Sequence, residues 1–428
     1  MKHTSPKLLT ALIAGTVAGS ASAAGFQILE QNASGIGNAY AGSAAVAENA
    51  STIFFNPAGM TELKDREVSL GLTAVQPSFK FQDKGSSVGT LGAAGNGGDA
   101  GQLGWVPNAY LSWALSKQWY VGIGVSAPFG LRTEYETPWK GSAQSNKFDI
   151  TTYNVNPSIA WKLNDTASLG AGLNWQKLKA EYLRRVATVA VVPPGLPGNT
   201  PLSLNLDDEA WGWNVGGLFR LAPATKLGLS YRSKIHYTVA GTIAGGSASP
   251  VVNAAVSSNA SASLTMPDVF IASLAHQLND RWELLGDISW TGWSSIPKLD
   301  IIRTSGAQAG TVAQTLDTDF RSTWRVALGG NYKMNDAWKL KLGVAYDQTP
   351  VKDASTRLAS LPDNDRIWFS AGAQWKASQN STLDFGLAYL YLKDADIDNN
   401  QSAAGRGRLT GTYNDSGWVA GVQYSTSF

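Results

Sequence analysis

The sequence predicts an all-β transmembrane fold, a 14-stranded antiparallel outer-membrane β-barrel plugged by an N-terminal hatch. Three observations lead to this prediction: a secretory leader, a segment of small residues behind it, and a regular series of strands, tight turns and long polar loops from Glu67 onward. The expected division is a signal peptide over 1–23, a hatch over 24–66 and a transmembrane barrel over 67–428.

The first 23 residues have the three parts of a secretory signal. Lys2 and Lys7 form a basic start, an apolar run covers residues 8–18, and Ala21-Ser22-Ala23 is an A-x-A cleavage site. The apolar run is shorter than the roughly 20 residues that a membrane-spanning helix needs, which argues against a short membrane anchor. The mature chain is therefore expected to begin at Ala24. Together with the barrel pattern described below, the leader predicts a location in the outer membrane of a Gram-negative bacterium.

The composition excludes several classes of function. Cleavage removes two of the 34 basic residues and none of the 32 acidic ones, so the mature chain is neutral and nothing points to nucleic acid. Without cysteine there are no disulfides and no thiolate metal sites. The two mature histidines, His236 and His276, lie near no nucleophile motif. We therefore expect no enzyme activity, no cofactor and no metal site.

The barrel prediction depends on a period of two residues. In residues 338–346, one face carries Trp338, Leu340, Leu342, Val344 and Tyr346, and the other carries Lys339, Lys341, Gly343 and Ala345. Residues 282–290 and 383–389 repeat this alternation. Lipid-facing and lumen-facing residues alternate in this way along barrel strands. The 16 Trp and 14 Tyr residues then suit aromatic girdles at the two membrane interfaces.

The connections give the number of strands. Six tight turns rich in Asn, Asp, Ser and Pro lie at 115–118, 163–166, 221–224, 278–281, 334–337 and 376–379. Seven longer connections lie at 82–104, 130–147, 186–203, 241–260, 294–319, 348–365 and 394–411. Together they join fourteen strands and place both ends of the barrel on the periplasmic side. Within one long connection, residues 298–303 are expected to extend a strand above the membrane.

Residues 24–60 are dominated by Gly, Ala, Ser and Asn and contain few large apolar side chains. Such a segment cannot bury enough surface to fold alone, so it must sit inside another structure. A barrel of about 8 strands is filled by its own side chains, whereas 16 to 18 strands leave an aqueous channel. A 14-stranded barrel falls between these limits, and the N-terminal segment is the expected plug.

Several stretches resemble the FadL family of outer-membrane transporters for long-chain fatty acids and other hydrophobic compounds. They are GFQ at 25–27, the stretch over 34–52, NPAGM at 56–60, TWRVALGGNY at 323–332 and DRIWFSAGAQW at 365–375. In this context Asn56, Pro57 and Ala58 match the motif of the family's hatch. The resemblance implies a monomer in contact with outer-membrane lipid and lipopolysaccharide, with a hydrophobic small molecule as its ligand.

The third expected strand is interrupted by Ser126, Ala127, Pro128, Phe129 and Gly130. Proline cannot donate a ladder hydrogen bond, and glycine bends or bulges a strand, so pairing with a neighbour should fail here. The alternative is that the strand merely ends before its loop. The resemblance implies an inward kink that opens a hole in the barrel wall.

Three residues are candidates for ligand binding. By resemblance, Phe26 and Arg184 line a high-affinity pocket, and Arg321 is a candidate second cation there for a carboxylate. Each arginine could equally be a lumen-wall charge paired with Asp or Glu. The connection over 186–197 is unusually apolar, which fits either a surface groove that captures a greasy substrate or a buried strand extension.

The resemblance implies passive, ligand-gated uptake of long-chain fatty acids through a plugged barrel with lateral exit. Two alternatives stay open. TodX-like members of the family take up monoaromatic hydrocarbons, for which a cation in the pocket should not matter. A porin or structural barrel would instead conduct small hydrophilic solutes.

Overall fold

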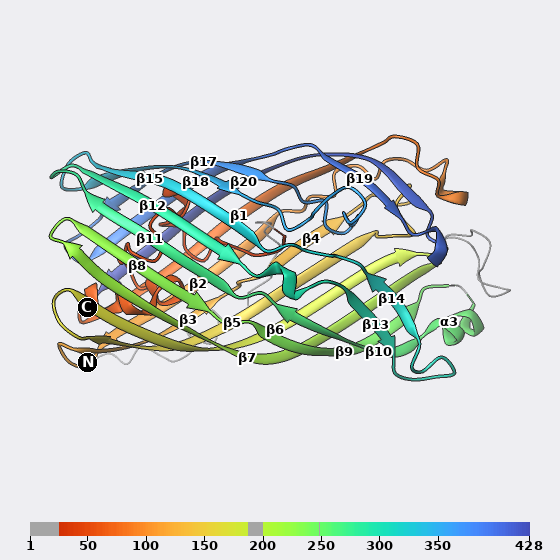
Figure 1. The fold of residues 1–428 in the computed structure, drawn as a ribbon, viewed down its shortest axis with the longest axis horizontal. Coiled ribbons are helices and arrows are strands. Elements are labelled where there is room, and N and C mark those ends of the chain that lie inside the picture. Colours follow the sequence, from red (N-terminus) through yellow and green to blue (C-terminus); the bar gives the residue numbers. More distant parts are fainter. Residues whose placement is uncertain (1–24, 187–199, 248) are drawn as a thin grey trace, which may run out of the picture.

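The computed structural model describes residues 25–186, 200–247 and 249–428. Its 20 strand segments form one continuous sheet that closes on itself as an antiparallel barrel of 14 strands, because six of these strands are each interrupted and counted as two segments. Figure 1 shows the tilted strands wrapped into this barrel. The predicted signal peptide and most of the apolar connection over 186–197 lie outside the described residues.

The elements follow each other in this order. The strands are β1 (Arg66–Asp83), β2 (Gly104–Ala114), β3 (Trp119–Ser126), β4 (Gly130–Glu134), β5 (Lys147–Lys162), β6 (Ala167–Arg185), β7 (Pro201–Ala222), β8 (Thr225–Arg232), β9 (Ile235–Gly245), β10 (Ser258–Met266), β11 (Val269–Gln277), β12 (Trp282–Thr291), β13 (Leu299–Arg303), β14 (Val312–Leu316), β15 (Thr323–Lys333), β16 (Trp338–Asp347), β17 (Arg366–Lys376), β18 (Ser381–Leu392), β19 (Ala395–Asn400) and β20 (Arg408–Ser427). The short helices are η1 (Ile36–Asn38), α2 (Thr52–Phe55), η2 (Pro57–Glu62), η3 (Gly89–Leu91), α3 (Pro250–Val256), η4 (Trp293–Ser295) and η5 (Ser402–Ala404). None of the helices in the described ranges is long and apolar enough to cross a membrane.

The predicted alternation is confirmed in the wall. On β16 the side chains of Leu340, Leu342 and Val344 are exposed on the outer face, whereas Lys341 between them is buried inside. Hydrogen bonds between β1 and β20 close the barrel. At the end with the tight turns, Trp119 stacks on Trp161 with ring centroids 5.5 Å apart, as expected for an aromatic girdle.

Several strands extend far toward the end of the barrel opposite the C-terminus. β13 pairs with β14 and, through two residues, with β10, which confirms the predicted strand extension over 298–303. Figure 1 shows β9, β10, β13 and β14 reaching this end together with α3. The long connections therefore form the outer mouth of the barrel.

Residues 25–65, which we call the N-terminal segment, lie inside the barrel (Figure 1, red to orange). η1 contacts β15 to β18 and β20, and η2 contacts β3, β5, β6 and β7. This close approach requires glycine, which has no side chain, at the contact positions of the wall. Gly170 and Gly216 are directly paired across β6 and β7. A Cβ atom on Gly216 would lie 2.1 Å from the Asn56 Oδ1 atom, and one on Gly170 would lie 2.4 Å from the Ala58 nitrogen.

Candidate functional site

The break between β3 and β4 is a β-bulge. Ser126 pairs with Asn154 and Gly130 with Thr151, so three residues, 127–129, stand opposite only two on β5. Thr152 satisfies the backbone of Phe129 with three hydrogen bonds. The Phe129 N–H donates to the Thr152 hydroxyl at 2.9 Å, and the Phe129 carbonyl accepts from the Thr152 N–H at 3.0 Å and from the Thr152 hydroxyl at 2.8 Å. A bulge of this kind bends its strand and locally disrupts pairing with the neighbouring strand, here β2 on the side away from β5.

On that other side the hydrogen-bond ladder of the wall is interrupted. The β2–β3 ladder ends at the pair Ala109 and Val125, although β2 continues to pair with β1 as far as Gly104. In the described sheet, residues 104–108 of β2 therefore have no ladder partner on β3 or β4. The side-chain amide of Asn108, in this stretch, is buried without a hydrogen-bond partner in the described chain.

The start of the N-terminal segment pairs with the bulge. Gln27 and Phe129 form an antiparallel bridge. Its flanking hydrogen bonds run from the Ile28 N–H to the Pro128 carbonyl and from the Gly130 N–H to the Phe26 carbonyl, both 2.8 Å. The Gln31 side chain adds two more, donating to the Ala127 carbonyl at 2.8 Å and accepting from its N–H at 3.1 Å. The segment thus behaves as a short strand laid across the wall break.

Phe26 lies in an aromatic cluster. Its ring centroid is 4.7 Å from that of Trp293 and 6.1 Å from that of Phe129, and Phe320 packs on Trp293 at 5.9 Å. Trp293 and Phe320 come from the breaks between β12 and β13 and between β14 and β15. Sequence reasoning missed Trp293. The signal was available, since Gly292 and Pro297 flank it directly after an alternating strand.

Charged groups hold the first residues of the segment. The Gly25 N–H donates to Asp363 Oδ2 at 2.9 Å, and this carboxylate also accepts from the Thr349 hydroxyl at 2.6 Å and pairs with Arg366. Nearby, burial raises the pKa of Glu30 from 4.5 to about 7, although Arg366 opposes the shift. The conformation in which the N-terminal segment lies against the wall, which we call docked, therefore favours the neutral form of Glu30.

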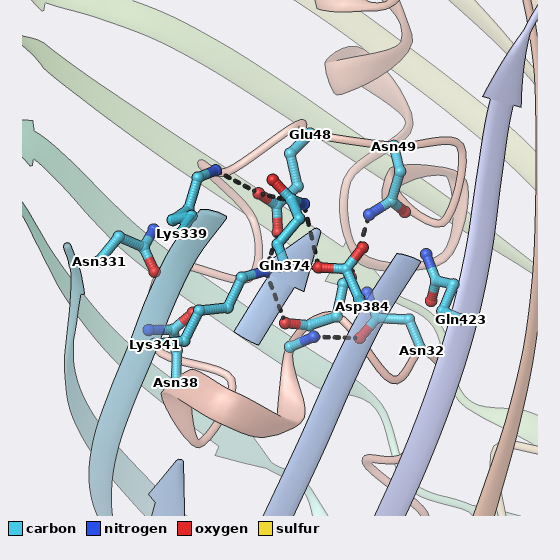
Figure 2. A network of polar contacts seen from close by, with 12 residues as sticks. Asn32, Asn38, Glu48, Asn49, Asn331, Lys339, Lys341, Gln374, Asp384 and Gln423 are labelled. Atoms are coloured by element: carbon cyan, nitrogen blue, oxygen red, sulfur yellow. Dashed lines mark hydrogen bonds and ion pairs between the residues drawn. The ribbon is translucent and has the colours of Figure 1, made fainter. Parts of the chain in front are cut away.

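A second set of contacts anchors the middle of the segment (Figure 2). The Lys341 ammonium, 1% exposed, pairs with Glu48 from the segment and with Asp384 on β18 at 3.0 Å, and donates to the Ser34 carbonyl at 3.0 Å. Lys339 contacts the other Glu48 oxygen at 3.0 Å. Burial alone would raise the pKa of Glu48, but these two lysines hold it well below its usual value.

The Asn-Pro-Ala motif is the third anchor. The Asn56 amide donates to the Ala44 carbonyl at 2.7 Å and to the Gly217 carbonyl on β7 at 2.9 Å. Its Oδ1 atom accepts from the Ala58 N–H at 3.1 Å and caps η2, which begins at Pro57. The motif thus fixes a turn of the segment directly against the wall.

An internal cavity adjoins the bulge. It is lined by Leu29, Phe55, Pro128, Arg232 and Arg325, among others, and its volume is about 50 Å³. Ligand pockets typically measure roughly 300–1,000 Å³. A molecule of ligand size can therefore occupy this point only if the N-terminal segment moves.

Arg184 and Arg321, the two predicted cations, lie in different surroundings. Arg184 lines two adjoining cavities at the outer end, and its Nε donates to Gln314 Oε1 at 3.0 Å. Neither cavity is lined by Phe26, although one apolar cluster runs from Phe26 to Tyr182, two residues from Arg184. Arg321 instead donates to the Thr349 carbonyl at 3.1 Å and lies 3.9 Å from Asp365 Oδ1, which agrees with the alternative of a paired wall charge. Its role in a carboxylate pocket stays a prediction.

A closed barrel with an apolar outer face, an internal segment and a break in its wall defines an outer-membrane transport barrel. The sequence model of a family described as outer membrane protein transport protein (OMPP1/FadL/TodX) matches residues 14–428. The chain belongs to this family, whose members transport hydrophobic compounds across the outer membrane of Gram-negative bacteria and are not enzymes.

Individual relatives agree with this assignment. Outer membrane protein P1 of Haemophilus influenzae is 30% identical over 90% of this chain and 89% of its own. The long-chain fatty acid transport protein of Escherichia coli O6:H1 is 28% identical over 95% and 94%. The crystal structure of a Pseudomonas aeruginosa FadL homologue superposes with a TM-score of 0.86 at 25% identity, over 95% of this chain and all of its own.

Proposed function

We propose that this protein takes up long-chain fatty acids across the outer membrane by passive, ligand-gated diffusion, as a monomer with a lateral exit. The observation that carries the proposal is the pairing of residues 26–28 with the bulge at Pro128. Phe26 faces the aromatic cluster while its backbone holds the bulge. A ligand that displaces the Phe26 ring therefore loosens the contact at the wall break, which couples capture to release.

The N-terminal segment acts as the hatch. Its middle is anchored by Lys341 and Asn56, whereas its first residues are held by backbone hydrogen bonds and the contact to Asp363. We expect ligand binding to move only residues 25–31 and to leave the rest in place. Hydrophilic solutes then stay excluded throughout transport, which separates this protein from a porin.

A lateral exit at residues 127–129 suits a hydrophobic cargo. The polar saccharide layer outside the membrane is the barrier for such a molecule, and the acyl interior dissolves it. Arg184 beside apolar wall residues suits a substrate with a carboxylate and an aliphatic chain. The name of the Escherichia coli relative supports the same substrate class. A monoaromatic hydrocarbon is the alternative, for which this cation would have no role.

Uptake of labelled oleate tests the substrate class. Cells that lack their own outer-membrane fatty-acid transporter would express the parent chain or Arg184→Gln at matched surface levels. We expect uptake by the parent and at least a tenfold reduction in the variant. Toluene uptake by both chains without oleate uptake would contradict the fatty-acid assignment and favour the monoaromatic alternative.

Deletion of Pro128 tests the lateral exit. It leaves two residues opposite two on β5, which restores a continuous ladder and keeps Phe129 on the lumen face, now paired with Thr152. Pro128→Ala is the matched control, because it keeps the extra residue and hence the bulge. We expect the deletion to abolish oleate uptake and the control to retain it. Equal uptake by both variants would rule out the exit at this point.

A further inference from the structure

Three arginines meet at the outer mouth of the barrel. Arg184 at the end of β6 lines one cavity together with Arg303 at the end of β13, and an adjoining cavity together with Arg406 from the connection before β20. Both cavities share Ala313 and Gln314 as well. Segments that are far apart in the sequence thus bring three guanidinium groups to one place.

None of the three arginines forms an ion pair with a carboxylate in the described part of the chain. Their hydrogen-bond acceptors in the described chain are neutral oxygen atoms. Arg184 donates to Gln314 Oε1 at 3.0 Å, Arg303 to the Val256 carbonyl at 2.7 Å and Arg406 to Gln401 Oε1 at 3.1 Å. The sequence has no Asp or Glu in 1–24 or 187–199, so the undescribed stretches add no carboxylate.

The environment makes this arrangement costly without a ligand. Arg406 is 7% exposed, and burial lowers the pKa of its guanidinium. Like charges held close together in a partly buried site repel each other, whereas an anion between them would pair with all three. Asp317 also lines the outer cavity, but in the described chain it forms no ion pair with any of the three arginines. By contrast Arg408, two residues from Arg406, pairs with Asp398 at 2.5 Å.

The inner cavity also offers an apolar surface next to the cations. It is lined by Leu202, Leu204, Ile243 and Ile301 in addition to the arginines. Leu204, Ile243 and Ile301 belong to the apolar cluster that continues to Phe26. The outer cavity has a volume of about 570 Å³, which is the size of a ligand pocket. An anionic head at the arginines would leave an aliphatic tail against this wall.

We propose that Arg184, Arg303 and Arg406 together bind the anionic headgroup of an amphiphile at the outer mouth, with Arg303 and Arg406 as binding residues in addition to Arg184. This inference rests on the proposed function and refines it. The three cations make the mouth selective for carboxylate-bearing amphiphiles over uncharged molecules of the same chain length. Bidentate pairing of guanidinium with carboxylate supplies the selectivity.

Binding to the full chain in lipid nanodiscs tests the proposal, with oleate and its uncharged analogue oleyl alcohol as probes. The test variant is the double substitution Arg303→Gln and Arg406→Gln. Arg408→Gln is the matched control, since it removes a neighbouring arginine that is already paired. We expect the double variant to lose at least tenfold in oleate affinity and to bind oleyl alcohol like the parent, and the control to match the parent with both probes.

The outcomes separate the two proposals. Retained oleyl alcohol binding shows that the double variant is folded. If the double variant then binds oleate as tightly as the parent, the three-arginine site is wrong, whatever the uptake assay gives. If the parent supports no oleate uptake in cells, the proposed function fails even where purified protein binds oleate through the three arginines. An equal loss of both probes in the double variant would also overturn the site.

Discussion

A Lys341→Met substitution should release the N-terminal segment from the barrel wall. The Lys341 ammonium contacts Glu48, Asp384 and the Ser34 carbonyl inside the barrel, where its side chain is almost completely buried. Methionine keeps a long unbranched apolar side chain, so the change removes a charge and its hydrogen bonds more than it removes packing.

The free-energy cost of this substitution depends on the contacts that Glu48 and Asp384 retain without Lys341. Glu48 retains Lys339 at 3.0 Å, whereas Asp384, itself 1% exposed, keeps the neutral Gln374 amide at 3.0 Å. Removing one partner of a buried pair costs about 3–5 kcal/mol. Because Glu48 stays paired, we take about 3 kcal/mol, the lower end of that range. At about 1.4 kcal/mol per factor of ten, the population of detached segment should rise roughly 100-fold.

Two measurements report the population of the detached segment. Substrate-free conductance in planar bilayers should increase, and backbone hydrogen exchange over 32–61 should become about 100-fold faster. Lys339→Met leaves the pair between Lys341 and Asp384 intact and should change both much less. Adding Asp384→Asn to Lys341→Met removes the stranded carboxylate and should recover most of the loss. Parent-like exchange and conductance in the Lys341→Met protein would refute the anchoring role.

Three further substitutions test other contacts of the segment. Asp363→Asn replaces the charged acceptor of the Gly25 N–H by a neutral one, and hydrogen bonds to charged groups are worth about 1.5–3 kcal/mol. Residues 25–31 should therefore become more accessible to protease. Unchanged cleavage would contradict this role of Asp363. Glu30→Gln should abolish a pH effect: because burial raises the pKa of Glu30 from 4.5 to about 7, docking should weaken as pH rises between these values. A spin label in the segment, compared at pH 5 and pH 8, should gain mobility at pH 8 in the parent only. Gly216→Val places a Cβ 2.1 Å from the Asn56 Oδ1 atom and should detach that turn, seen as faster exchange at 56–60, while the barrel keeps its heat-modifiable gel mobility.

Local patterns were enough to predict the wall. A period of two, as in residues 338–346, determines which side chains face lipid, and Asn, Asp and Ser clusters mark the turns. Both are local properties, so the number of strands could be counted from the sequence. The break near Pro128 could also be predicted, because proline and glycine disturb a ladder wherever they occur.

Contacts across the lumen could not be predicted in the same way. Lys341 looks like any lumen-facing lysine in the sequence, and its pairing with Glu48 and Asp384 exists only once the barrel closes around the segment. The grouping of Arg184, Arg303 and Arg406 likewise depends on three connections that meet at the mouth. Their positions follow from the strand register and tilt of the barrel, which no short motif encodes.

The coupling between the N-terminal segment and the wall break can be tested most directly with a reversible crosslink. Gln27 and Phe129 form a non-hydrogen-bonded antiparallel pair. The Cα atoms of such a pair lie about 4.5 Å apart, within the range that a disulfide spans. Since the chain has no cysteine, Gln27→Cys with Phe129→Cys creates a single possible bond.

Oleate uptake would be measured with the oxidised and the reduced double variant, and with each single variant as a control. We predict that uptake stops when the bond is closed and returns after reduction, while the single variants respond to neither treatment. Undiminished uptake by the fully oxidised double variant would contradict the claim that the segment must leave the bulge for substrate to pass.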